Sequence, residues 1–200
     1  NKFVHEETLA PIESINVPVV GGHTGTNSCA TAVPLFSQDP AAARLSEEVR
    51  QRLVTRVQEA NNEVSNAKKG KGSATLSMAY AGARFGQAVL AGLSGQRTVE
   101  SAFVKSSVFD GLDFFASRVT FGPQGVERVH PVGRISKAEN ELLKTAAELL
   151  REEIQEGERY MASYDTKSGA SGSNEQAAPG SNEQAGTSLA APQHASFRAA

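Results

Sequence analysis

The sequence has little cysteine, no long hydrophobic run and no cluster of positive charge. Cys29 is the only cysteine among 200 residues, so an internal disulfide is excluded and an oxidising compartment is not needed. No segment approaches the roughly 20 consecutive apolar residues that a membrane-spanning helix requires. No run of lysines or arginines could coat a phosphate backbone, and the net charge is −2. Nucleic acid and membrane are therefore not expected partners.

The N-terminus lacks an initiator methionine and the basic-then-apolar pattern of a secretory signal. It opens at Asn1 and continues at once into Phe3 and Val4, like the middle of an element. We therefore expect an intracellular chain that is either processed or a fragment of a longer protein. Hydrophobic residues make up 39% of the sequence, which is enough for one domain with a core and an additional tail.

The first half of the chain predicts a buried strand followed by a long helix. Residues Ile15 to Val20 are mostly β-branched and lead into Gly21 and Gly22, as in a buried strand that enters a tight turn. His23 directly follows this turn. Between Leu45 and Val64 apolar residues recur every three or four positions, with polar residues between them, which predicts one long amphipathic helix.

The second half predicts a helix rich in small residues, three strands and a final helix. Ser73 opens an alanine- and glycine-rich segment up to Leu93, which predicts a helix packed closely against others, with Ser73 as its N-cap. Alternating or β-branched residues predict antiparallel strands at 98–105, 114–121 and 125–129. Ser136 and Glu139 form a capping box at the start of a helix that ends near Tyr160. Helices beside a small antiparallel sheet make an α+β domain.

The composition changes near Thr166. Beyond this residue the chain consists mainly of glycine, serine, alanine, asparagine, glutamine and proline, and the five residues 173–177 recur as 181–185. Such a segment has too few apolar residues to form a core. The sequence therefore predicts a folded domain over residues 1–165 and a low-complexity, disordered tail over residues 166–200.

Five phrases match one protein family in the same order and with nearly the same spacing. They are NKFV at 1–4, VPVVGGHTG at 17–25, VPLFSQ at 33–38, AKKGKGSATLSMAYAGARF at 67–85 and VESAFVK at 99–105. The ordered set resembles the C-terminal substrate domain of NAD-dependent malate dehydrogenases of the mitochondrial and bacterial type. The resemblance implies the α+β lactate/malate dehydrogenase-like fold, with long helices packed on a small antiparallel sheet.

His23 is the catalytic residue that this resemblance implies. In the family, hydride passes between the nicotinamide of NAD and C2 of malate or oxaloacetate, while a histidine moves the hydroxyl proton. Imidazole suits that task because its ordinary pKa, about 6.5, lets it accept and return a proton near neutral pH. A turn that follows a strand would also expose the ring to a cleft.

Other parts of the family's site are missing from the sequence. The family uses an aspartate to orient the histidine and arginines to grip the substrate carboxylates, and none of these can be assigned here. No glycine-rich strand-turn-helix unit that could bind a dinucleotide is present. The nucleotide-binding half would thus precede Asn1, and the chain alone is expected to be inactive.

Further contacts are implied at four positions. Met78 matches a methionine that packs near the nicotinamide, and Thr31 is the best match for a threonine near the cofactor. Ser73 and Ala74 match positions beside the substrate at the start of a helix, where free amide groups favour an anion. Core packing at helical spacing is the alternative explanation of Met78. No metal site is expected.

Between Gly25 and Val33 the chain is a few residues longer than the family pattern, and Thr26 to Cys29 are the simplest insertion. A longer turn directly after His23 could displace the ring. This leaves open an alternative function, a non-catalytic paralogue that acts as a binding or scaffold protein.

The resemblance also implies partners and a compartment. Malate and oxaloacetate are the expected substrates, and a homodimer is the expected assembly, with the helix from Ser73 to Leu93 as one packing face. A mitochondrion or another organelle is favoured over the cytosol.

Overall fold

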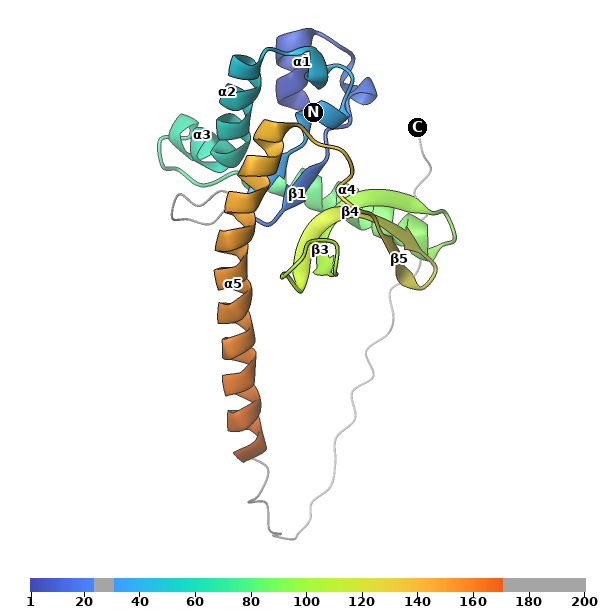
Figure 1. The fold of residues 1–200 in the computed structure, drawn as a ribbon, viewed down its shortest axis with the longest axis vertical. Coiled ribbons are helices and arrows are strands. Elements are labelled where there is room, and N and C mark those ends of the chain that lie inside the picture. Colours follow the sequence, from blue (N-terminus) through green and yellow to red (C-terminus); the bar gives the residue numbers. More distant parts are fainter. Residues whose placement is uncertain (24–30, 171–200) are drawn as a thin grey trace, which may run out of the picture. The chain divides into compact units, whose positions relative to one another are not determined.

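The computed structural model describes residues 1–23 and 31–170 (Figure 1). The chain divides into two compact units, residues 1–161 and 162–200. The elements in chain order are α1 (Lys2–Thr8), the 3-10 helix η1 (Ile12–Ser14), β1 (Val19–Gly21), β2 (Ala32–Pro34), the 3-10 helices η2 (Phe36–Gln38) and η3 (Ala42–Arg44), α2 (Glu47–Gln58), α3 (Ala60–Ala67), α4 (Thr75–Leu93), β3 (Thr98–Lys105), β4 (Phe114–Gly122), β5 (Gly125–Val129) and α5 (Lys137–Ala170).

The five strands form one antiparallel sheet in which β4 is central. One edge of β4 pairs with β3 along its length. The other edge is divided between two partners, because β1 pairs with it only at Ala116 and β5 pairs from Val119 to Gly122. β2 continues the sheet beyond β1. Helices beside this small antiparallel sheet confirm the α+β class.

The main core forms between the sheet and α5. Alternate residues of β4 are buried, as the two-residue period of a strand requires. The buried residues of this core are Val20, Val33, Leu35, Leu112, Phe115, Leu143, Ala146, Ala147 and Leu150. A second core under α1 and α2 consists of Val4, Ile15, Phe36, Ala42, Leu53 and Val54. Leu142 packs against both clusters, so the start of α5 joins them.

The three strands predicted in the second half are confirmed. β3 and β5 have the predicted bounds, and β4 continues one residue further, to Gly122. Gly125, the first residue of β5, has a φ of 89°, a conformation that glycine permits where the backbone reverses after β4. These strands were predictable because alternation and turn residues are both local signals.

The single helix predicted from Leu45 to Val64 is wrong. α2 ends at Gln58, Glu59 has non-helical angles of −101° and 7°, and α3 begins at Ala60. Two asparagines follow the break, and their side chains compete with the backbone for hydrogen bonds. The Gln58 side chain donates to the Ala32 carbonyl at 3.2 Å, which ties the end of α2 to the sheet.

The predicted strand from Ile15 to Val20 is also too long, because β1 covers only Val19–Gly21. Ile15 instead closes the 3-10 helix η1 by donating its backbone N–H to Ile12. Pro18 has no N–H to donate to a neighbouring strand. A prediction from β-branched composition alone therefore gives a longer strand than the structure contains.

The final helix begins where predicted and continues past Tyr160 to Ala170. The division into a domain of residues 1–165 and a tail of residues 166–200 stays a prediction, since residues 171–200 lie outside the described part of the chain. Within that part, no helix is both long and apolar enough to span a bilayer.

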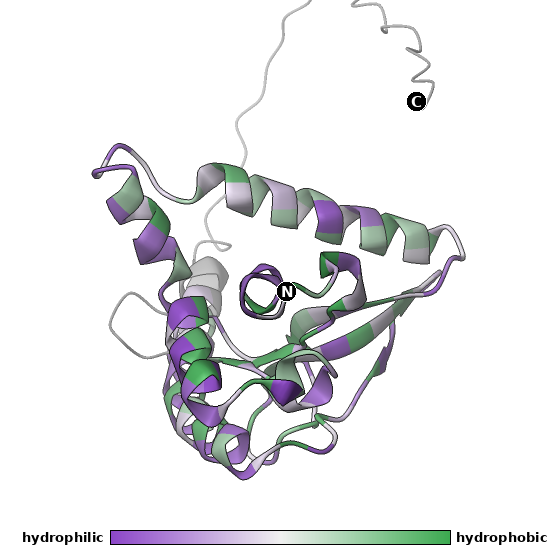
Figure 2. Ribbon diagram, turned by 90° about the horizontal axis from the view of Figure 1, so that it is seen from above, coloured by the Kyte–Doolittle hydropathy of each residue, from purple (hydrophilic) through white to green (hydrophobic). Residues whose placement is uncertain are grey.

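α4 packs on the sheet with one side only. Gly92 lies against Phe121, where an added Cβ would come within 2.8 Å of the Phe121 Cβ. Phe85 meets Phe121 edge-on, with ring centroids 5.7 Å apart. Large apolar side chains on the rest of the helix are exposed, among them Leu76 at 81% and Leu90 at 64%. Figure 2 shows α4 along one side of the domain, with its outer surface uncovered by other described elements.

Glu139 is a buried carboxylate that joins α5 to η2. It accepts from the backbone N–H groups of Ser37 at 2.8 Å and Ser136 at 2.7 Å, and from the Ser37 hydroxyl. Its own N–H donates to the Ser136 hydroxyl at 3.2 Å, which confirms the capping box. Burial acts to raise the pKa of Glu139, but the hydrogen bonds from Ser37 and Ser136 outweigh it, so the pKa is lowered.

We predict that Glu139→Gln lowers the free energy of unfolding by about 1–3 kcal/mol at pH 7, because charge-assisted hydrogen bonds to buried donors are lost. The folded-state pKa is depressed, so the stabilisation is complete above the unfolded value of about 4.3 and disappears as the pH falls through the folded value. Urea unfolding at pH 7 and pH 3 measures this. The difference in the free energy of unfolding between variant and wild type should be smaller at pH 3 than at pH 7. The control is Glu141→Gln, which removes only an exposed pair with Lys144.

We predict that the 200-residue chain associates or aggregates in solution, because the outer side of α4 exposes contiguous apolar area. Replacing Leu76 and Leu90 by glutamine should shift light scattering and sedimentation toward a monomer. The control is Val126→Gln, which removes an exposed apolar side chain on β5. It should change neither the light scattering nor the sedimentation of the chain. A wild-type chain that is monodisperse and melts cooperatively as a monomer would contradict this prediction.

Candidate active site

His23 is placed by a two-glycine turn at the end of β1. Gly21 has a φ of 102°, a conformation that residues with a side chain rarely adopt. A Cβ on Gly21 would lie 2.1 Å from the Thr31 carbonyl oxygen, and one on Gly22 would lie 2.9 Å from Cδ1 of Leu150. Only glycine permits the chain to pass this closely between β2 and α5, and the exposed His23 follows directly.

Thr31 holds the backbone of this turn. Its side chain is completely buried. Its hydroxyl donates to the carbonyl oxygen of His23, and its own carbonyl accepts from Gly22 N–H at 3.0 Å. The structure thus brings together two of the residues singled out from the sequence, although the Thr31 hydroxyl is engaged by His23 and does not point to an open site.

His23 borders a cavity of about 830 Å³ between the sheet and α5. Its other lining residues are Gly22, Phe103, Phe114, Ala116, Leu150, Glu153, Ile154, Gly157, Glu158 and Met161. The aromatic side chains Phe103 and Phe114 stack with their centroids 6.1 Å apart. The described lining is mostly apolar, and its charged members are the carboxylates of Glu153 and Glu158. The described residues of the lining include no arginine or lysine that could attract an anion.

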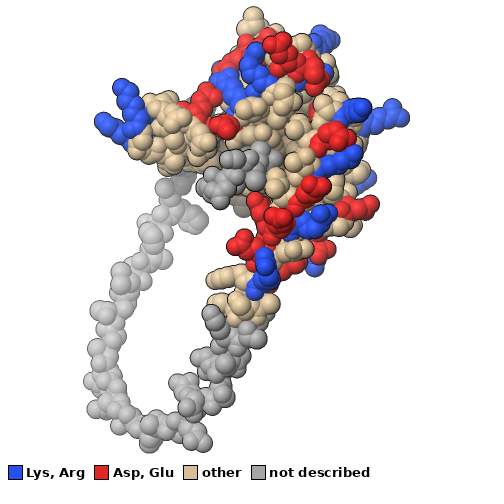
Figure 3. All heavy atoms as spheres, turned by 60° about the vertical axis from the view of Figure 1, so that its left-hand side comes forward, with Lys and Arg blue, Asp and Glu red and all other residues tan. Residues whose placement is uncertain are grey.

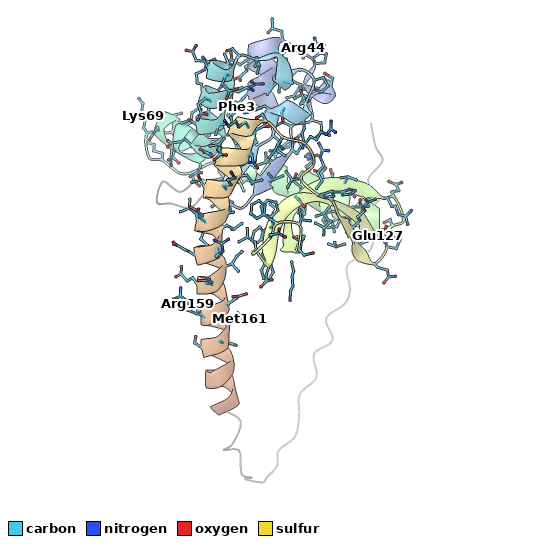
Figure 4. The ribbon with its side chains drawn as sticks, in the orientation of Figure 1. Phe3, Arg44, Lys69, Glu127, Arg159 and Met161 are labelled. Atoms are coloured by element: carbon cyan, nitrogen blue, oxygen red, sulfur yellow. The ribbon has the colours of Figure 1, made fainter. Side chains whose placement is uncertain are left out.

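The residues from α5 were not singled out from the sequence as site residues. Leu150, Ile154, Gly157 and Met161 recur at spacings of three and four, so they share one face of the helix. That periodicity could have identified the wall of the cavity, but the sequence alone does not say which element this face covers. Figure 3 shows acidic and basic side chains interleaved along α5. Figure 4 labels Met161 on the same helix.

Ser73, Ala74 and Met78 form a second group at the start of α4 and do not line the cavity beside His23. The prediction that Ser73 caps α4 is wrong: the N-cap is Ala74, and no side chain accepts a capping hydrogen bond. Ser73 lies one residue too early, and its carbonyl instead accepts from the Lys68 ammonium group at 2.6 Å. Ala74 is buried, whereas Met78 is 61% exposed.

The described residues do not by themselves fit NAD. Dinucleotide sites lie at the carboxyl ends of parallel strands, beside a glycine-rich turn into a helix, and all strand pairs here are antiparallel. Thr31 is buried and engaged, so Met78 is the exposed candidate for a cofactor contact. In the described part of the chain no three histidine, cysteine, aspartate or glutamate side chains are grouped to hold a metal ion. The predicted insertion at Thr26 to Cys29 lies outside the described residues.

The sequence is similar to known proteins over most of its length. Residues 1–161 match the alpha/beta C-terminal domain of lactate/malate dehydrogenase. The mitochondrial malate dehydrogenase of Schizosaccharomyces pombe is 47% identical over 165 residues, which are 81% of this chain and 47% of the relative. That of Saccharomyces cerevisiae is 44% identical over 166 residues, with 81% and 48% covered.

A similar fold is found in the solved malate dehydrogenase of Salinibacter ruber. The TM-score is 0.64 at 22% identity, and the match covers 81% of this chain and 52% of that one. The chain thus spans about half the length of the relatives that it matches. The matched family domain and the identity to these relatives show that the chain belongs to the lactate/malate dehydrogenase family, whose C-terminal domain it contains.

Proposed function

We propose that this chain is the catalytic C-terminal part of an NAD-dependent malate dehydrogenase that interconverts malate and oxaloacetate. The observation that carries the proposal is an exposed imidazole, His23, fixed by a glycine turn at the border of a large cavity. It occurs within a domain that belongs to the lactate/malate dehydrogenase family. The malate dehydrogenases named above are the most specific guide to the substrate.

In the proposed reaction His23 accepts the proton of the malate hydroxyl and returns it in the reverse direction. NAD, which another part of the protein would hold, would accept the hydride from C2. The oxidation is balanced: the hydroxyl of malate loses a proton and C2 loses a hydride. The C2–O group then becomes the carbonyl of oxaloacetate. The ring is exposed at the border of the cavity, and imidazole is the side chain most often used for proton exchange near neutral pH.

The carboxylates of malate need cations that the described cavity lacks. Glu153 and Glu158 would repel a dicarboxylate, and the remaining lining is apolar or aromatic. Since the chain spans about half of its relatives, we propose that the arginines that bind substrate belong to the other half. Ser73 and Ala74 remain proposed substrate neighbours, and Met78 and Thr31 remain proposed cofactor contacts.

A homodimer and an organellar location are part of the same proposal. The exposed apolar side of α4 gives a face that a second subunit could cover. The curated relatives named above are mitochondrial proteins, which supports a mitochondrion or another organelle over the cytosol.

A binding or scaffold function without catalysis is the alternative. It rests on the longer segment that follows His23 in the sequence. Such a protein would keep the fold and the glycine turn and would have no need for a free imidazole. The catalytic and scaffold functions predict different effects on malate turnover when the imidazole of His23 is removed.

We predict that His23→Ala in the full-length protein lowers kcat for malate oxidation by about 10²- to 10⁴-fold, the usual contribution of a positioned acid-base group. Steady-state assays with matched circular dichroism measure this, and His5→Ala is the control because His5 bonds the Ala10 carbonyl away from the cavity. The 200-residue chain alone should turn over no malate. An unchanged rate in His23→Ala would favour the scaffold function.

We predict that Thr31→Val, which keeps the shape of the side chain, lowers kcat by about 10- to 100-fold and changes KM less than about threefold. Loss of the hydrogen bond to the His23 carbonyl would let the ring shift, and a shift near 1 Å can cost about a hundredfold in rate. The control Thr55→Val removes an exposed hydroxyl on α2. Equal losses in both variants would show that Thr31 acts only through stability.

A further inference from the structure

A second cavity, of about 660 Å³, lies where the edge of β4 changes its partner. β1 pairs with β4 at Ala116 and β5 pairs from Val119 onward, so Ser117 and Arg118 lie at the gap between these two strands. His130 closes one side of the gap by donating its backbone N–H to the Arg118 carbonyl at 2.8 Å. This cavity shares no lining residue with the one beside His23.

The lining of this cavity is positively charged. Arg118 comes from β4, Arg128 from β5 and Arg134 from the connection between β5 and α5. Among the described residues, no carboxylate lines the cavity. Elsewhere, five arginines pair with a glutamate within 2.9 Å: Arg50, Arg52, Arg56, Arg84 and Arg97. Across residues 1–23 and 31–164, no ion pair occupies the three guanidinium groups of the cavity.

Ser117 adds a hydroxyl without a partner. The residue lines the cavity, is only 1% exposed, and its Oγ has no hydrogen-bond partner. Buried polar atoms in folded proteins are nearly always paired, so an unpaired one calls for a missing partner. An oxyanion bound in the cavity would accept this hydrogen bond.

The loop that carries Arg134 is held in place before any ligand binds. The Gln38 side-chain amide donates to the Val132 carbonyl at 2.6 Å and to the Arg134 carbonyl at 3.1 Å. His130 bonds through Nε2 to the Thr120 hydroxyl at 2.7 Å. A site whose backbone is fixed in advance loses less conformational entropy when a ligand binds.

We propose that this cavity, here called the arginine cavity, binds the phosphate group of a small molecule. Arg118, Arg128 and Arg134 come from three different segments, and a phosphate has enough terminal oxygens to accept from several guanidinium groups at once. The hydroxyl of Ser117 supplies a further donor. The site is independent of the proposed dehydrogenase activity, because none of its residues borders the His23 cavity.

The test is isothermal titration calorimetry of the full-length protein with inorganic phosphate and pyrophosphate, at pH 7 and at constant ionic strength set with chloride. Wild type should bind at least one of the two anions. The double variant Arg128→Gln/Arg134→Gln should bind at least about tenfold more weakly, since each lost charge-assisted pair is worth roughly a factor of ten. Ser117→Ala should weaken binding by a smaller factor without loss of the folded circular dichroism spectrum.

The matched control is Arg44→Gln/Arg159→Gln, which changes the net charge equally on η3 and α5, elements that do not line the arginine cavity (Figure 4). It should leave the affinity within about twofold of wild type. Absence of binding by wild type, or equal losses in the cavity and control variants, would overturn the proposal. Loss of phosphate binding with unchanged malate turnover would separate this site from the proposed active site.

Discussion

The close passage of the chain between β2 and α5 is the constraint on which the proposed active site depends. Two successive glycines fill a space where any Cβ would collide with the Thr31 carbonyl or the Leu150 side chain. The turn is locked because Gly22 donates to Thr31 while the Thr31 hydroxyl donates to His23. The backbone position of His23 is therefore set by the glycine turn and core packing together.

The turn that carries His23 is supported by the rest of the domain. The domain has a core on each side of the first turns of α5, which supports the strand that presents His23. The cavity beside the histidine is apolar and acidic, a surface suited to packing and unsuited to binding a dicarboxylate. Under the proposed function, the groups that bind the substrate carboxylates therefore belong to another part of the protein.

Local signals made much of the fold predictable. β3 and β5 were found with their bounds because alternation and a two-residue turn lie within the segments themselves, and the capping box at Ser136 and Glu139 is equally local. The break at Glu59 was missed because it accompanies a contact between Gln58 and Ala32, far away in the sequence. Periodicity within one segment cannot reveal such a contact.

The candidate site was less predictable than the fold. A motif shared with a family identified His23, since no periodicity distinguishes one histidine from another. Thr31 was singled out as a cofactor contact, whereas the structure shows its hydroxyl on the His23 backbone. The wall supplied by Ile154, Gly157 and Glu158 depends on where α5 packs, which is a tertiary property. The arginine cavity likewise depends on a gap in strand pairing that no single segment encodes.

The divided edge of β4 also has a consequence for how the chain folds. β3, β4 and β5 are consecutive and meet through short connections, so this meander can form early. β1 must return from the far end of the sequence to reach Ala116, and closing so long a loop is entropically costly. We therefore expect β1 to dock late, and until it does part of the β4 edge offers unpaired backbone groups to other chains. The hydrogen bonds of the histidine turn join Gly22 and His23 to Thr31, beside the β1–β2 pair, and do not depend on this step.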